Sequence, residues 1–121
     1  MLSEHINSFI CQFNVLIRIV ASQNNLSVSQ YLTLYNISPN GITMSELSKA
    51  VGVDNSTLTR NMNILIRKLL VSKERSHEDR REFKVTLTEQ GEKIIYSMEK
   101  QMDQKIESIA SDLDSQQREQ L

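Results

Sequence analysis

The chain has few of the residues on which β-rich, disulfide-bonded or zinc-binding proteins depend. Among its 121 residues are three glycines, one proline and one cysteine. Because tight turns between short strands use glycine and proline, this scarcity argues against a fold of many strands. Cys11 has no partner for an internal disulfide, and no CxxC or paired His/Cys spacing suggests a structural zinc site. We therefore expect a mainly α protein with no metal and no cofactor.

Long hydrophobic runs and targeting signals are also missing. The most apolar stretch, residues 9–21, is interrupted by Cys11, Gln12, Asn14 and Arg18, whereas a membrane span needs about 20 apolar residues. The first residues place no basic segment ahead of an apolar one, as an export signal would. We expect no transmembrane helix, no membrane partner and a cytoplasmic location.

The charge of the chain is unevenly distributed. The length and the composition, 39% hydrophobic and 24% charged, fit one globular domain. The net charge is only −1, yet residues 60–84 carry eight basic and four acidic side chains, while both flanking segments are acidic overall. A localised basic segment of this kind is the footprint expected of a nucleic-acid contact.

Helical spacing and helix caps organise the first half of the chain. Apolar residues over 6–20 recur with the period of an amphipathic helix. Capping boxes of the form S/T-x-x-Q/E at residues 27–30 and 43–46 predict the starts of two further helices, and Gly52 predicts the end of the second. Asp54 can cap the helix that follows. The last two of these helices, separated by a short turn with a glycine, predict a helix-turn-helix.

The pattern changes to alternation after this motif. Residues 71–75 and 82–87 alternate in polarity around a polar connection at 76–81, which predicts a β-hairpin. Thr88 then caps a long helix of about 22 residues, and residues 114–117 could cap a further one.

The long helix carries an apolar stripe that a small domain cannot cover. At 1.5 Å per residue it would extend roughly 33 Å, beyond the body of the domain. The stripe has steps of three and four residues and consists of Ile95, Met98, Met102, Ile106, Ile109 and Leu113. We expect it to pack against a partner.

Candidates for catalysis are few. His5 and Cys11 are six residues apart, about 240° around a helix, so they do not form a nucleophile pair. His77, Glu78 and Asp79 are consecutive in a polar connection, which is typical of solvated turn residues rather than of a metal site. No phosphate loop and no G-x-S-x-G motif is present. We expect no enzyme.

The helix after Asp54 has small polar side chains at its N-terminal end. Such side chains allow a helix to enter the major groove, where hydroxyls bind phosphates and Arg60 or Asn63 can contact base edges. An ordinary surface helix could carry the same residues, but the basic hairpin directly after it favours DNA. The candidate DNA-binding residues are Asn55, Ser56, Thr57, Thr59, Arg60 and Asn63 on the helix and Lys73, Arg75, Arg80 and Arg81 on the hairpin.

The tip of the hairpin combines arginines with an acid. Arg80 and Arg81 suit the narrow, electronegative minor groove. Asp79 would repel phosphate there unless it is paired. We therefore expect Asp79 to orient an arginine through a bidentate salt bridge.

Three motifs together resemble the MarR-type winged-helix transcriptional regulators. They are Thr43-Met44-Ser45-Glu46-Leu47, Val53-Asp54-Asn55-Ser56-Thr57-Leu58-Thr59-Arg60, and Glu78-Asp79-Arg80-Arg81 followed by Leu87-Thr88-Glu89-Gln90-Gly91. The resemblance implies a mainly α winged helix-turn-helix with a β-hairpin wing and N- and C-terminal dimerisation helices. Within a single domain of residues 1–121, the DNA-binding lobe would cover about 27–92 and the dimerisation helices about 3–21 and 88–121.

The resemblance also implies roles for individual residues. Ser56, Thr57, Thr59 and Arg60 match the recognition-helix contacts of the family. Arg81 matches the wing arginine that enters the minor groove, with Asp79 as its support. The implied dimer interface joins Ile6, Phe9 and Phe13 of the first helix with Ile95, Met98, Met102, Ile106, Ile109 and Leu113.

The function implied is transcriptional regulation by a homodimer on a pseudo-palindromic operator in double-stranded DNA. Members of the family usually repress, and a small aromatic or lipophilic effector commonly binds between the DNA-binding lobe and the dimer helices. Two alternatives remain open at this point. They are a winged-helix protein-protein adaptor and an oxidant-sensing regulator that uses Cys11.

One position, Leu69, departs from the family pattern, and another, Cys11, bears on the oxidant-sensing alternative. Where the family usually has glycine, this chain has Leu69, so the turn before the hairpin must be made by a residue with a Cβ or by a longer helix. Oxidant-sensing members carry a cysteine in the first helix, as Cys11 is here. Because Phe9, Ile10 and Phe13 surround Cys11 in sequence, we expect a buried and inert thiol.

Overall fold

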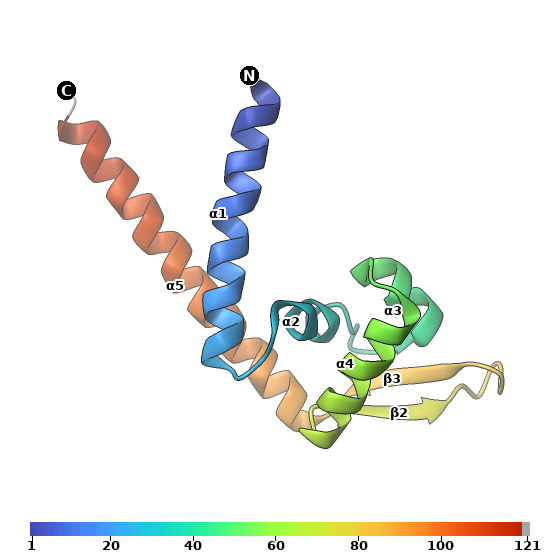
Figure 1. Cartoon of the computed structure of the whole chain (residues 1–121). Coiled ribbons are helices and arrows are strands. Elements are labelled where there is room, and N and C mark those ends of the chain that lie inside the picture. Colours follow the sequence, from blue (N-terminus) through green and yellow to red (C-terminus); the bar gives the residue numbers. More distant parts are fainter. Residues whose placement is uncertain (120–121) are drawn as a thin grey trace.

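The computed structural model describes the backbone of residues 1–119 and the side chains of residues 1–111. Its elements are α1 (Leu2–Gln23), α2 (Val28–Tyr35), β1 (Ile42–Thr43), α3 (Met44–Val51), α4 (Asn55–Arg67), β2 (Val71–Arg75), β3 (Phe83–Leu87) and α5 (Glu89–Glu119). Two long arms, α1 and α5, lie against each other near their base and diverge toward the termini, while α2, α3, α4 and the sheet form a lobe beside that base (Figure 1). The predicted mainly α fold with a hairpin wing is confirmed.

The predicted caps set the ends of the short helices. At the start of α2, the Ser27 hydroxyl accepts from the backbone N–H of Gln30, and the Gln30 side chain accepts from the N–H of Ser27, each at 3.1 Å. Thr43 and Glu46 form the same reciprocal pair at the start of α3. Gly52 ends α3 with φ +72°, a left-handed conformation that glycine adopts without steric penalty.

The wing belongs to a three-stranded antiparallel sheet with β3 in the centre. The hairpin of β2 and β3 is as predicted, except that β3 begins one residue later, at Phe83. The strand β1 was not predicted, because two residues are too short to show an alternating pattern. It forms because Ile42 pairs with Val85 at the base of the wing.

Leu69 makes the turn that connects α4 to the wing. Its φ is +62°, and its N–H donates to the carbonyl of Ile66 at 2.9 Å. The next N–H, of Leu70, donates to the carbonyl of Leu65 at 3.0 Å. These two bonds form a Schellman motif, the usual left-handed ending of a helix. Of the two alternatives, a residue with a Cβ therefore makes the turn.

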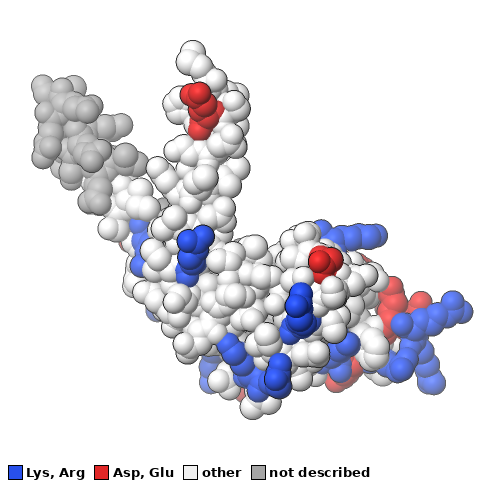
Figure 2. Space-filling view, viewed as in Figure 1, with Lys and Arg blue, Asp and Glu red and all other residues white. Residues whose placement is uncertain are grey.

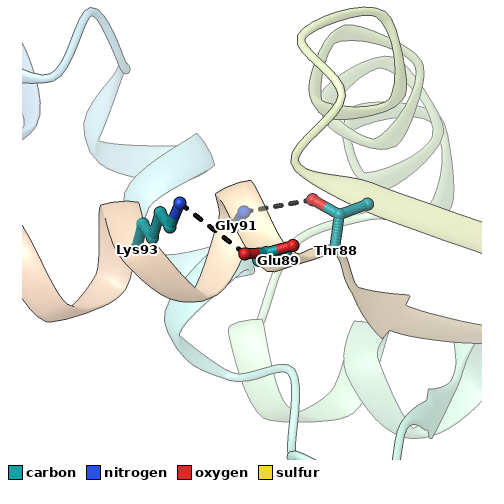
Figure 3. Close-up of polar contacts among 4 residues, drawn as sticks. All are labelled: Thr88, Glu89, Gly91 and Lys93. Atoms are coloured by element: carbon teal, nitrogen blue, oxygen red, sulfur yellow. Dashed lines mark hydrogen bonds and ion pairs between the residues drawn. The ribbon is translucent and has the colours of Figure 1, made fainter.

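The helix α5 starts at a hydroxyl cap. The Thr88 hydroxyl accepts from the backbone N–H of Gly91 at 3.0 Å, and Lys93 forms an ion pair with Glu89 at 3.7 Å (Figure 3). The helix spans 31 residues, about 46 Å, rather than the expected 22. Residues 114–117, which could have capped a further helix, instead lie within α5. These residues include neither glycine nor proline, and cap-forming side chains alone do not break a helix.

The core lies where α1, α2, α4, α5 and the sheet meet. The buried hydrophobic residues are Val20, Ala21, Leu26, Tyr31, Leu34, Ile37, Leu47, Leu58, Met62, Leu65, Leu70, Val71, Val85 and Met98. Among the described residues, no helix combines the length and the hydropathy needed to cross a membrane.

The apolar stripe of α5 divides into two parts. Met98 is only 1% exposed in the core of its own chain, so it belongs to that core and not to an interface with a partner. Ile95 and Met102 are partly buried against the same core. Ile106 and Ile109, farther along the arm, are 41% and 44% exposed. The side chain of Leu113 lies outside the described residues.

Candidate nucleic-acid interface

Asp54 organises the N-terminal end of α4. Its carboxylate oxygen Oδ1 accepts from the backbone N–H of Thr57 at 2.7 Å and from the hydroxyl of Ser56 at 2.9 Å. The Thr57 N–H is the largest of the effects that lower the pKa of the Asp54 carboxyl below its usual value. Ser56 and Thr57 are therefore held in place before any ligand arrives.

The outer face of α4 presents the polar residues that the sequence predicted. Asn55, Ser56, Thr59, Arg60 and Asn63 are exposed, and Thr57 is half-buried. The Arg60 guanidinium donates to the Thr57 hydroxyl at 3.4 Å, and the Thr59 hydroxyl donates to the carbonyl of Asn55 at 2.8 Å. Arg60 thus has an intrahelical support, and its guanidinium retains further donors for a ligand.

The inner face of α4 contains a buried polar residue, Asn61, that was not among the predicted site residues. Asn61 is 7% exposed, and its side-chain N–H donates to the hydroxyl of Ser29 in α2 at 2.7 Å. The missed signal is its spacing, because Asn61 falls three residues after Leu58 and four before Leu65, in the buried stripe. The bond fixes the rotation of α4 relative to α2.

Two basic residues of the wing, Lys73 and Arg75, are held by specific contacts. Lys73 and Arg75 of β2 both lie over the ring of Phe83 in β3, at 4.4 Å and 5.0 Å from its centroid. The Arg75 guanidinium also donates to the carbonyl of Arg80 at 2.8 Å. Arg75 therefore connects the strands of the wing to the loop at its tip.

The expected salt bridge of Asp79 is wrong. Among the described side chains, Asp79 makes no ion pair with an arginine. Its Oδ1 instead accepts from the backbone N–H of Arg81 at 3.0 Å. The Ser76 hydroxyl accepts from the N–H groups of Glu78 and Asp79 at 3.3 Å and 3.4 Å. Asp79 thus shapes the backbone that carries Arg81 rather than the arginine side chain itself.

A notch of about 280 Å³ joins α4 to the wing. It is lined by Met44, Ser45, Asn55, Leu58, Thr59, Lys73 and Phe83. The fold therefore brings three predicted residues together, Asn55 and Thr59 from α4 and Lys73 from the wing. It does not bring Arg80 and Arg81 to this notch, because they lie at the tip of the hairpin.

Basic side chains gather on the lobe, since residues 60–84 contain eight of the fourteen lysines and arginines of the chain. Figure 2 shows lysines and arginines over the lower side of the lobe and at its far end, whereas the outer part of the α1 arm is almost uncharged. Acidic residues lie among the basic ones at that far end. The lobe thus has the uneven charge of a polyanion-binding face, whereas the outer part of α1 is almost uncharged on the side shown.

Apolar side chains of the two arms, α1 and α5, are exposed in the single chain. Ile6 is exposed, Phe9 is 61% exposed and Phe13 is half-buried. With Gln12, Leu16, Ile106 and Ile109, the two phenylalanines line a groove between α1 and α5.

Cys11 lies on the same open part of α1. The expectation of a buried thiol is wrong, since Cys11 is exposed. The physical reason is that its apolar neighbours Phe9 and Ile10 are themselves exposed, so no core covers this end of the helix in the single chain.

A second cavity, of about 470 Å³, lies between α1, α2 and α5. Its lining residues are Phe13, Ile17, Tyr31, Leu32, Tyr35, Glu99, Met102 and Asp103. The rings of Tyr31 and Tyr35 are nearly parallel, with centroids 6.3 Å apart. Burial, followed by the proximity of Tyr35 and Glu99, raises the pKa of the Tyr31 phenol.

Comparison with known proteins shows a matching family model and solved structures that are similar to this chain. The model of a family described as transcriptional regulator SarA/Rot matches residues 15–98. Wild-type MarR from E. coli in its apo form is 23% identical, with a TM-score of 0.83 over 100% of this chain and 96% of that one. A mutant of MepR from S. aureus is 21% identical, with a TM-score of 0.82 over 99% and 90% of the two chains.

A second S. aureus MepR mutant, bound to an oligodeoxyribonucleotide, is 21% identical. Its TM-score is 0.74 over 99% of this chain and 89% of that one. At these identities the structural matches establish the fold, and the predicted winged helix is confirmed.

Proposed function

The chain belongs to the SarA/Rot family of transcriptional regulators, and from this membership we propose that it acts by binding a specific sequence in double-stranded DNA. In this proposal α4 occupies the major groove and the wing, residues 71–87, lies along the adjacent minor groove. The family is one of regulators, which agrees with the prediction that the chain is not an enzyme.

One observation carries the proposal. The exposed polar face of α4 continues across the notch, so Asn55 and Thr59 share one surface with Lys73 of the wing. Contacts from the helix can then specify sequence while the wing supplies electrostatic attraction. The oligodeoxyribonucleotide bound to MepR, a protein of the same fold, supports the assignment.

We further propose that the protein is a homodimer that represses from a pseudo-palindromic operator. The support is the apolar surface of the arms, where Phe9, Ile106 and Ile109 are exposed together around the groove. Soluble proteins usually cover such a surface. Two-fold pairing of the arms would cover it and would present two copies of α4 to successive half-sites.

The cavity between α1, α2 and α5 is a candidate effector site. Apolar walls and the paired rings of Tyr31 and Tyr35 suit a small aromatic or lipophilic molecule, and Glu99 and Asp103 favour one with a positive charge. A ligand there would touch both α2 and α5, and could thereby change the position of the lobe relative to the arms. Release of DNA by an aromatic cation, lost in Glu99→Gln, would support this role.

DNA binding is tested by selecting bound duplexes from a random pool and measuring affinity at several salt concentrations. Arg60→Ala should weaken binding to the selected duplex by about 1–3 kcal/mol and change binding to unrelated DNA less. Arg81→Ala should weaken both, and reduce the slope of log affinity against log salt by about one. Arg18→Ala, on the α1 arm, is the matched control and should have neither effect. A parent protein without salt-dependent binding would contradict the proposal and favour the adaptor alternative.

A further inference from the structure

The wing carries one aromatic ring beneath two cations. Phe83 of β3 lies directly opposite Arg75 of β2 in the hairpin register. The Nζ of Lys73 is 4.4 Å from the centroid of the ring and the guanidinium carbon of Arg75 is 5.0 Å from it. Both cations are exposed, whereas Phe83 is half-buried. The negative face of an aromatic ring attracts cations at such distances.

Each cation connects the ring to a different part of the interface. Lys73 and Phe83 both line the notch that contains Asn55 and Thr59 of α4. Arg75 donates to the carbonyl of Arg80 at 2.8 Å, and so restrains the loop at the tip. The ring of Phe83 is therefore in contact with Lys73, which lines the notch beside α4, and with Arg75, which restrains the tip.

The ring of Phe83 offsets two effects that would otherwise weaken phosphate binding by Lys73 and Arg75. Lysine and arginine side chains lose much rotamer freedom when they bind phosphate, and that loss weakens binding. Two like charges placed two residues apart on a strand also repel each other. A ring that attracts both cations reduces their freedom before DNA arrives and keeps them on one face of the hairpin.

We propose that Phe83 is a positioning residue of the DNA interface, which preorganises Lys73 and Arg75 to bind phosphates. The ring acts through the two cations and not by contacting a base. This role rests on the proposed function, because the phosphates of DNA are the groups that the two cations would meet.

The first part of the test needs no DNA. The ring current of Phe83 should shift the side-chain methylene protons of Lys73 and Arg75 upfield in NMR spectra of the parent protein. Phe83→Tyr should keep these shifts, and Phe83→Leu should remove them. Random-coil shifts for both side chains in the parent would overturn the proposal, whatever the protein does with DNA.

The second part measures affinity for the selected duplex. Phe83→Leu keeps an apolar side chain in the notch, and it should weaken binding by about 3- to 10-fold, whereas Phe83→Tyr should retain the affinity of the parent. Lys73→Ala should have a smaller effect in the Phe83→Leu background than in the parent. Equal effects of Lys73→Ala in the two backgrounds would overturn the positioning role. Thermal melting of each variant separates this result from a loss of folding.

A second cation-ring pair provides the matched control. Lys100 lies 5.1 Å from the ring centroid of Tyr96 on α5, outside α4 and the wing. Tyr96→Leu removes an equivalent contact and should leave DNA affinity unchanged. A parent that shows the ring-current shifts but binds no duplex would instead overturn the proposed function, and with it the role of Phe83 in DNA binding.

Discussion

Gly91 lies against the carbonyl group of Leu70, so closely that an added Cβ would be 2.1 Å from the carbonyl oxygen. The same oxygen accepts from the backbone N–H of Thr88 at 3.0 Å, and the Thr88 hydroxyl caps the first turn of α5 through Gly91. The first turn of α5 thus packs directly on the backbone that leads into β2. This contact sets the position of the wing relative to the α5 arm.

Gly91→Ala should destabilise the protein. The new methyl group meets backbone rather than a movable side chain, so the start of α5 must shift, and we expect the free energy of unfolding to fall by about 3 kcal/mol. Urea unfolding followed by circular dichroism measures the change. Gln90→Ala, at the exposed neighbouring position, is the control and should stay within about 0.5 kcal/mol of the parent. Equal stability of the two variants would contradict the close approach.

Leu69→Gly should stabilise the protein. Leu69 has a φ of +62°, which is unfavourable for a residue with a Cβ, and its side chain is 68% exposed, so its removal loses little burial. We expect a gain of about 1 kcal/mol, measured as a higher melting temperature. Leu69→Ala keeps the Cβ and should show no such gain. A gain of the same size from alanine would mean that the side chain, not the backbone, is the source.

The stability of α4 should depend on the charge of Asp54. Because the backbone N–H of Thr57 lowers the pKa of this carboxyl in the folded protein, its contribution is present above the pKa of the unfolded chain, about 4. It is lost as the pH falls through the folded value. Between about pH 6 and about pH 2, the parent should therefore lose more stability than Asp54→Asn, which keeps the cap without titrating. Parallel pH profiles of the two proteins would rule out this linkage.

Two substitutions at Asp79 separate its charge from its hydrogen bond. Asp79→Ala removes the acceptor for the Arg81 N–H, so the tip should loosen and DNA affinity should fall. Asp79→Asn can keep that acceptor and removes a negative charge near phosphate, so it should bind at least as tightly as the parent. Both are measured on the selected duplex. Tighter binding by Asp79→Ala would show that the charge outweighs the support.

The proposed dimer predicts an effect of charge on the arms. Ile106→Glu and Ile109→Glu place a carboxylate in the exposed apolar surface of α5, and pairing of two arms would bury that charge. Each should shift the parent dimer to a monomer in sedimentation velocity at micromolar concentrations. Gln104→Glu adds the same charge at an exposed polar position of the same helix and should remain dimeric. A parent that sediments as a monomer would contradict the dimer.

Local sequence sets the ends of the short helices, the hairpin and the polar face of α4. Ser27, Thr43, Asp54 and Gly52 act on backbone groups at most four residues away, so their effect is present in the local sequence. The alternation of the hairpin and the periodicity of α4 are local in the same sense. The motifs around these residues were also sufficient to predict the winged helix, which the structure and the comparisons confirm.

Only packing between separate segments determines which of several similar residues lies in the core and which remains exposed. Met98 and Ile109 belong to one apolar stripe, yet only Met98 lies where α5 passes the core, and only packing makes that distinction. The bond from the Arg81 N–H to Asp79 is different, because it spans two residues and is a local Asx-turn contact typical of aspartate. Phe83 meets Lys73 and Arg75 only through strand pairing across the hairpin. The burial of Met98 and the contacts of Phe83 depend on how separate segments come together, and the periodicity of any one segment carries no information about them.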